Sequence, residues 1–181
     1  MSDDSLKRAY DRTSYILVVD DDDTLLKFFK IHLNKFFSRV IVVKNAKEAI
    51  ATLREKEIDL VLSDIHMPRM NGLDLMKRVR KINSAIPVLL ISGAMLNEEE
   101  EQLAEEMSDG FLRKPFSVDD LHSFLDAGMD LRIKYQELES FLPDKKAVRD
   151  VLRGKAKVKK FVKDKNLEKV EALAEELKKV S

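Results

Sequence analysis

Short apolar runs recur along the first two thirds of the chain, and a segment with apolar residues at every third or fourth position follows each run. The runs predict strands at residues 15–19, 40–43, 58–62, 86–91 and 110–113. The segments between them, such as residues 24–37, have the periodicity of amphipathic helices. Because strand and helix alternate five times, the pattern predicts an α/β fold with a doubly wound, five-stranded parallel sheet covered by helices on both faces.

Polar side chains follow four of the five predicted strands. They are Asp20 and Asp21 after the first strand, Asp64 after the third, Ser92 after the fourth and Lys114 after the fifth. Because functional crevices of such sheets lie beyond the carboxyl ends of the strands, we expect these side chains to meet. Three carboxylates in one crevice repel one another, and a hard cation with oxygen ligands, such as Mg²⁺, compensates their charge.

The chemistry of this set favours phosphoryl transfer. An aspartate carboxylate can act as a nucleophile and form an aspartyl-phosphate. The ammonium group of Lys114 and a bound metal ion would neutralise charge on the transferred group, and the hydroxyl of Ser92 offers it a hydrogen bond. The strand ends therefore predict a magnesium-dependent phosphoacceptor site.

Four segments carry a family resemblance. They read ILVVDDDDTLL from residue 16, VLSDIHMPRMNGLDL from 61, VLLISGA from 88 and FLRKPF from 111. Together and in this order they resemble the signatures of a response-regulator receiver domain of two-component systems, of the flavodoxin-like, chemotaxis-regulator type. The resemblance covers residues 15–127.

The resemblance implies a role for each site residue. Asp64 would be the phosphoacceptor, and Asp20, Asp21, Asp64 and the backbone carbonyl of His66 would hold Mg²⁺. Ser92 and Lys114 would contact the phosphoryl group, Ser92 and Phe111 would be the switch residues, and the Lys114–Pro115 bond would be cis. The phosphoryl donor would be a sensor histidine kinase, and the chain would promote its own phosphotransfer rather than act as an enzyme.

Three residues depart from the usual family pattern. Phe111 lacks the hydroxyl of a tyrosine, so switching there must rest on ring packing, and Gly93 follows Ser92 where alanine is more usual. His66 lies two residues after Asp64. Either its ring screens the acyl phosphate or changes its lifetime, or only its backbone matters.

An alternative enzyme interpretation starts from residues 20–24. Their sequence DDDDT also fits the D-x-D-x-T pattern of haloacid-dehalogenase-type phosphatases, with Asp20 as nucleophile and Asp22 as general acid. This interpretation leaves Asp64 unexplained, and the further acidic residues that such enzymes need are not found after a later strand.

Composition excludes several classes of site. The chain has no cysteine, which excludes disulfides, thiolate zinc sites and a cysteine nucleophile. No apolar run is long enough to span a membrane, and we expect no secretory signal and a cytoplasmic protein. His32 and His122 show no metal-ligand spacing, so we expect helix-surface or core histidines and no zinc site.

The predicted last helix continues beyond an ordinary receiver. We therefore divide the chain into an N-terminal extension (1–13), a receiver (14–127) and a helical extension (128–181). A heptad stripe, typical of a coiled coil, runs through this helix until Pro143; its members are Leu121, Phe124, Gly128, Leu131, Tyr135, Leu138 and Leu142. We expect this stripe to pack on the rest of the tail or on a second copy of the chain, as a homodimer.

The tail is basic although the formal net charge of the chain is zero. Residues 145–165 carry ten basic and two acidic side chains. Two outputs remain open: a protein-protein interaction with an unknown downstream partner, or binding of DNA through residues 145–165, which would depend steeply on salt. The first is favoured because the basic stretch lacks arginine-rich or aromatic reading elements.

Overall fold

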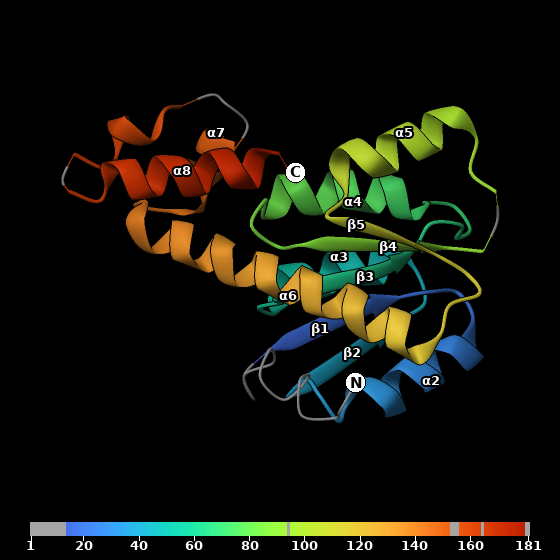
Figure 1. Cartoon of the computed structure of the whole chain (residues 1–181). Coiled ribbons are helices and arrows are strands. Elements are labelled where there is room, and N and C mark those ends of the chain that lie inside the picture. The colour runs from blue at the N-terminus through green and yellow to red at the C-terminus, as the bar shows by residue number, and fades with distance from the viewer. Residues whose placement is uncertain (1–13, 94, 153–155, 164, 180–181) are drawn as a thin grey trace.

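The computed structural model describes residues 14–93, 95–152, 156–163 and 165–179. The predicted N-terminal extension, residues 1–13, lies outside the described residues. Figure 1 shows a single sheet flanked by helices, with a long helix, α6, leading to the C-terminal elements.

The sheet is parallel throughout and has the strand order β2-β1-β3-β4-β5. Its strands are β1 (Tyr15–Val19), β2 (Arg39–Val43), β3 (Leu60–Asp64), β4 (Val88–Ser92) and β5 (Gly110–Arg113). Every residue of β3 and β4 is buried, which explains why these strands are continuous apolar runs rather than alternating ones. The predicted doubly wound α/β fold is confirmed.

Helices cover both faces of the sheet. The helices of the receiver are α2 (Asp23–Leu33), α3 (Ala46–Glu55), α4 (Gly72–Ile82), α5 (Glu98–Met107) and the first half of α6 (Val118–Phe141). One core cluster packs α3, α4 and α5 against the sheet, and a second packs α2 and α6 against the opposite face. Asparagine or serine caps several of these helices, including the predicted caps Asn45 and Ser117.

Some predicted boundaries and faces are wrong. The third and fourth strands begin at Leu60 and Val88, two residues later than predicted. The first helix ends at Leu33 rather than at residue 37, and it buries Leu26, Phe29 and Leu33. Phe28 and Ile31 also recur at helical spacing but are exposed, because α2 carries two apolar stripes and only one faces the sheet.

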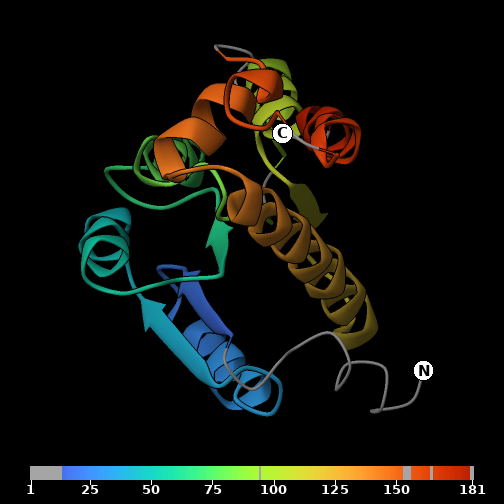
Figure 2. The same cartoon turned by 90° about the vertical axis from the view of Figure 1, so that its left-hand side faces the viewer.

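The second half of α6 builds a core of its own. It packs with α7 (Lys145–Leu152), the short 3-10 helix η1 (Val158–Lys160) and α8 (Leu167–Lys178). Figures 1 and 2 both show these elements gathered at one end of α6, away from α2. The described part of the tail is therefore a folded helical unit that continues from the receiver.

The heptad stripe of α6 is buried within the chain. Leu121, Leu131, Tyr135, Leu138 and Leu142 are all buried, and Phe124 is partly buried. At Gly128 a Cβ atom would lie 2.8 Å from Leu89 Cδ1 and 3.0 Å from Leu60 Cδ1, so glycine lets the helix approach the sheet closely. The stripe packs on the sheet and then on the tail, and the predicted use of this stripe in a homodimer is not supported.

Candidate phosphoacceptor site

The polar residues at the strand ends do converge. Asp64 and Ser92 are the last residues of the neighbouring strands β3 and β4, and Asp20 directly follows β1 on the other side of β3. The backbone N–H of Lys114, just beyond β5, donates to the carbonyl oxygen of Ser92 at 2.8 Å. The parallel register thus brings residues from four strands to one edge of the sheet, as predicted.

Lys114 joins two of the carboxylates. Its Nζ lies 2.6 Å from Asp64 Oδ1 and 3.2 Å from Asp20 Oδ2. Asp20 and Asp64 have side chains only 2% and 7% exposed. The ammonium group therefore offsets part of the repulsion between these two buried acids.

Backbone N–H groups satisfy the remaining carboxylate oxygens. The N–H of Asp22 donates to Asp20 Oδ1 at 2.8 Å, and the N–H of His66 donates to Asp64 Oδ2 at 2.7 Å. These bonds fix the orientation of both carboxylates relative to Lys114. The loop after β3 is equally constrained, because a Cβ atom at Gly72 would lie 2.2 Å from the carbonyl oxygen of Asp64.

Burial and charge shift two pKa values in this site. Burial, together with the charge of Asp64, raises the pKa of Asp20. The hydrogen bond from the N–H of Asp22 and the charge of Lys114 lower it, but by less, so the pKa is raised overall. Burial lowers the pKa of Lys114, but its contacts with Asp64 and Asp20 outweigh this, so that the pKa of Lys114 is raised. The lysine is cationic, and the crevice still has an excess of acidic groups.

The predicted cation ligands are only partly assembled. Asp20 and Asp64 are held together through Lys114, whereas Asp21 is exposed. Within the part of the chain that the structure describes, no three histidine, aspartate or glutamate side chains surround one point as metal ligands.

His66 contacts Ser92 through its side chain, which the sequence alone could not establish. Nδ1 of the exposed His66 lies 3.0 Å from Oγ of the buried Ser92. The hydroxyl that is expected to meet a phosphoryl group is thus hydrogen-bonded to the imidazole. The position of His66 two residues after Asp64 was the only signal of this contact in the sequence.

The predicted switch residue Phe111 lies on β5. Its ring is partly buried against the core cluster of α3, α4 and α5, and the guanidinium of Arg113 lies 5.5 Å from the ring centroid. The Lys114–Pro115 peptide bond is cis, as predicted.

The comparisons with known proteins agree with this geometry. Residues 16–126 match the family model of the response regulator receiver domain. The chain belongs to this family. In this receiver, the edge of the sheet that carries Asp64 lies within the matched residues, and most of the tail lies beyond them.

Relatives and solved structures extend the match. Transcription factor SKN7 of Saccharomyces cerevisiae is 33% identical over 111 residues, which cover 61% of this chain and 18% of that protein. Transcriptional regulatory protein GlrR of Escherichia coli is 26% identical over 119 residues, 66% of this chain and 27% of that protein. A CheY-like receiver domain protein from Methanospirillum hungatei is 25% identical with a TM-score of 0.63, and the match covers 67% of this chain and 98% of that one. The chain thus spans less than a third of the length of these two curated relatives.

The acidic residue that the phosphatase interpretation needs as general acid has another role. Asp22 is the N-cap of α2, and its Oδ1 accepts the N–H groups of Thr24 at 2.7 Å and Leu25 at 3.3 Å. The receiver family match and this capping role both count against the phosphatase interpretation.

No helix among the described residues has the length and apolar character to cross a membrane.

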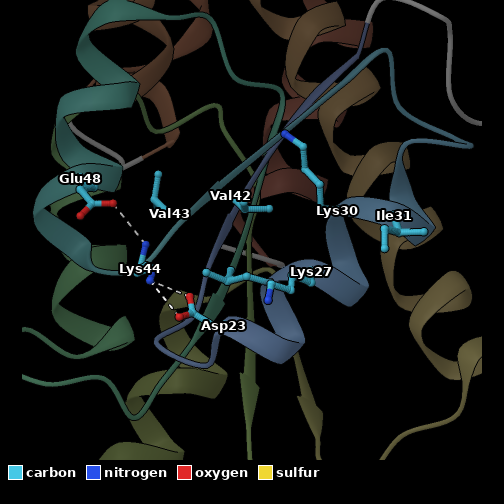
Figure 3. Close-up of a pocket in the computed structure, with 9 residues that line it drawn as sticks. Asp23, Lys27, Lys30, Ile31, Val42, Val43, Lys44 and Glu48 are labelled. Atoms are coloured by element: carbon cyan, nitrogen blue, oxygen red, sulfur yellow. Dashed lines mark hydrogen bonds and ion pairs between the residues drawn. The ribbon is translucent and has the colours of Figure 1, made fainter.

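A separate hollow lies at the free edge of the sheet. It has a volume of about 480 Å³ and lies between α2 and β2, with Lys27, Lys30 and Lys44 around it (Figure 3). Lys30 Nζ donates to the carbonyl oxygen of Val40 at 2.7 Å, and Lys44 is paired with Asp23 at 2.7 Å. These lysines cover the edge strand and disfavour pairing with a second sheet.

Proposed function

We propose that this receiver accepts a phosphoryl group on Asp64 from a sensor histidine kinase and signals through its helical tail. The observation that carries the proposal is the position of Lys114 Nζ, 2.6 Å from Asp64 Oδ1 at the carboxyl end of β3. A cation at this place stabilises the negative charge that a transferred phosphoryl group brings.

Mg²⁺ is the proposed cofactor. Asp20, Asp21, Asp64 and the backbone carbonyl of His66 would hold it, and their hard oxygen atoms suit this ion. The raised pKa of Asp20 supports the fit, because burial beside Asp64 leaves this carboxylate short of compensating charge. When bound, Mg²⁺ would supply positive charge to the phosphoryl oxygens.

The chain's own residues then have defined roles. A carboxylate oxygen of Asp64 attacks the phosphorus of the kinase phosphohistidine; the new O–P bond forms as the N–P bond breaks, and the imidazole leaves with its electron pair. The ammonium group of Lys114 moves from the carboxylate of Asp64 to the phosphoryl oxygens, which now carry the negative charge. Ser92 releases its hydrogen bond to His66 and donates to the phosphoryl group instead. The chain is a phosphoacceptor that promotes its own modification and does not turn over a substrate.

The proposed division of the chain is a receiver over residues 14–127 and a helical extension over 128–181. A separate core beneath the second half of α6 supports this division. We expect the extension to contact a downstream protein in the cytoplasm, with α6 carrying the change of state from the receiver.

Binding of DNA by the basic tail is the second candidate. The names of two relatives, a transcription factor and a transcriptional regulatory protein, favour it. A gel-shift assay at low and moderate salt distinguishes the two outputs, because contacts of lysine with phosphate weaken steeply as salt rises. Absence of binding at low salt would remove this candidate.

Labelling by a phosphodonor tests the phosphoacceptor. Asp64→Asn should abolish Mg²⁺-dependent labelling by a phosphorylated histidine kinase or by acetyl phosphate. Asp22→Asn is the matched control, because asparagine still caps α2 and the residue has no role in this mechanism. Retained labelling in Asp64→Asn, or its loss in Asp22→Asn, contradicts the proposal, and the first result would revive the phosphatase interpretation.

A further inference from the structure

The side chains of His32 and His122 meet between α2 and α6, although 90 positions separate them in the sequence. Their Nε2 atoms lie 2.7 Å apart. Both are partly buried helix residues, as expected, but their spacing in the sequence did not predict that they meet; neither belongs to the phosphoacceptor site.

The two rings face each other edge to edge. Their planes differ by only 12° and their centroids are 4.9 Å apart. The distance between the centroids is close to the sum of the distance between the Nε2 atoms and the two ring radii. Both Nε2 atoms therefore lie near the line that joins the centroids. Because the planes are also nearly parallel, the rings lie almost in one plane, with the two Nε2 atoms facing each other. Two nitrogen atoms in this arrangement share a single hydrogen, with one donating and the other accepting.

Aromatic side chains hold the pair in place. The ring of Phe28 is nearly parallel to that of His32 with centroids 5.4 Å apart, and the ring of Phe36 lies 5.0 Å from that of His122. Burial, followed by the charges of His122 and Lys35, lowers the pKa of His32. The imidazole of His32 is thus kept in the neutral form that binds metal ions.

We propose that His32 and His122 form a binding site for a divalent transition metal of the Zn²⁺ class, which takes the place of the shared hydrogen. Zinc binds imidazole nitrogen at about 2.0–2.1 Å with tetrahedral geometry, so two such nitrogen atoms lie about 3.3 Å apart. The Nε2 atoms must separate by about 0.6 Å, and each ring must turn by roughly 35° so that its lone pair points at the metal instead of at the other nitrogen. Both rings are only partly buried, which leaves room for this turn. The ring that carried the hydrogen on Nε2 moves it to Nδ1 through water, and no proton is lost.

Water completes the coordination of the metal in this proposal. The described residues bring no third histidine, aspartate or glutamate to the pair. The site is chemically distinct from the carboxylate crevice, because imidazole selects zinc-like ions whereas carboxylate and carbonyl oxygen select Mg²⁺.

A metal ion here would link α2 and α6, two helices that begin close to the phosphoacceptor site. α2 begins two residues after Asp21, and α6 begins four residues after Lys114 and leads into the tail. Zinc between His32 and His122 would therefore restrain the movement of α6 relative to the crevice.

Calorimetric titration of Zn²⁺ into the untagged full chain tests the site, with excess Mg²⁺ present to fill the acidic crevice. We expect one zinc ion per chain. His32→Gln or His122→Gln should weaken binding roughly a hundredfold, because the second imidazole then no longer binds intramolecularly. Lys27→Gln, at an exposed position on the same helix as His32, is the matched control, for which no change in zinc binding is expected.

Nitrogen-15 NMR of the histidine rings keeps the test independent of how the variants fold. In the unaltered protein, zinc should shift the Nε2 signals of His32 and His122 and leave a proton on each Nδ1. No zinc binding, binding that survives in both single variants, or a shift at Nδ1 instead of Nε2 would overturn the proposal and leave the pair as a shared-hydrogen contact only.

Discussion

The phenolic oxygen of Tyr135 lies 3.1 Å from Oδ1 of Asp109, so the second half of α6 is hydrogen-bonded to the residue that immediately precedes β5. The other oxygen of Asp109 accepts from the guanidinium of Arg80 and, at 2.6 Å, from the N–H of Val88. Tyr135 and the side chain of Asp109 are completely buried. The tail is thus anchored to the strand that carries Phe111 and leads to Lys114.

Removal of the Tyr135 hydroxyl should destabilise the protein. In Tyr135→Phe, one oxygen of a buried carboxylate loses a partner, which costs about 1–3 kcal/mol. Denaturant unfolding measures the change. Tyr15→Phe is the control, because no hydrogen bond of its hydroxyl contributes to this network, and it should have little effect. Equal stability of the Tyr135→Phe and unaltered proteins would mean that the contact does not anchor the tail.

Loss of Arg80 should have a larger effect. Its guanidinium is buried, and besides Asp109 it donates to the carbonyl oxygen of Ile86 at 2.9 Å. Burial lowers the pKa of Arg80, but the charge of Asp109, the nearby Tyr135 and the hydrogen bond to Asp109 together raise it above its ordinary value, so Arg80 is cationic. Arg80→Met leaves the carboxylate of Asp109 buried without its cation, at a cost of about 3–5 kcal/mol.

The same helix provides the control for Arg80. Arg78 is exposed on α4, and Arg78→Met should change the free energy of unfolding by no more than about 0.5 kcal/mol. A double variant, Arg80→Met with Asp109→Asn, should lose less stability than the two single changes added together. Simple additivity would contradict a direct interaction.

Asp20→Asn should stabilise the protein at neutral pH while impairing Mg²⁺-dependent labelling. The pKa of Asp20 is raised in the folded state, mainly by burial, so ionisation of this group opposes folding. The gain, roughly 0.5–2 kcal/mol, is typical of changes that relieve a strained functional site.

The direction of the pKa shift of Asp20 determines how the stability gained in Asp20→Asn depends on pH. A raised folded pKa means that stability falls as the pH rises from the ordinary value of 3.8 through the folded pKa. The advantage of Asp20→Asn should therefore be complete above the folded pKa and vanish at pH values below 3.8. Thermal unfolding across this pH range checks it, and an advantage that persists in acid would point to another cause.

Much of the site was predictable because it depends on topology. Buried parallel strands are recognisable as apolar runs, and parallel strands necessarily bring their ends, and hence Asp20, Asp64, Ser92 and Lys114, to one edge. No comparable rule predicts which side chains meet where two helices pack against each other. The meeting of His32 with His122 depends on the rotation of α2, which carries two apolar stripes, and the sequence did not show which one is buried.

The tail was harder to predict for the same reason. The heptad stripe of α6 was correctly identified, but an apolar stripe does not specify whether its partner is the same chain or a second copy. The structure answers this through Tyr135 and Leu138, which are buried in the tail core. The buried contacts of Asp109 could not be predicted from the sequence, because an acidic residue just before a strand ordinarily lies in a solvated turn.

Phosphorylation should change the protection of the tail. Attraction of Ser92 toward a phosphoryl group and repacking of Phe111 would move β5, and Asp109 would transmit that movement to Tyr135 and α6. Hydrogen exchange of the full chain, with and without a beryllofluoride phosphoryl mimic and Mg²⁺, should show altered exchange in α6, α7 and α8. Asp64→Asn should show no such response, and Tyr135→Phe should keep the response around β5 while reducing it in the tail. If the mimic binds and leaves exchange in the tail unchanged, the receiver does not signal through these helices, and the output must lie on another surface.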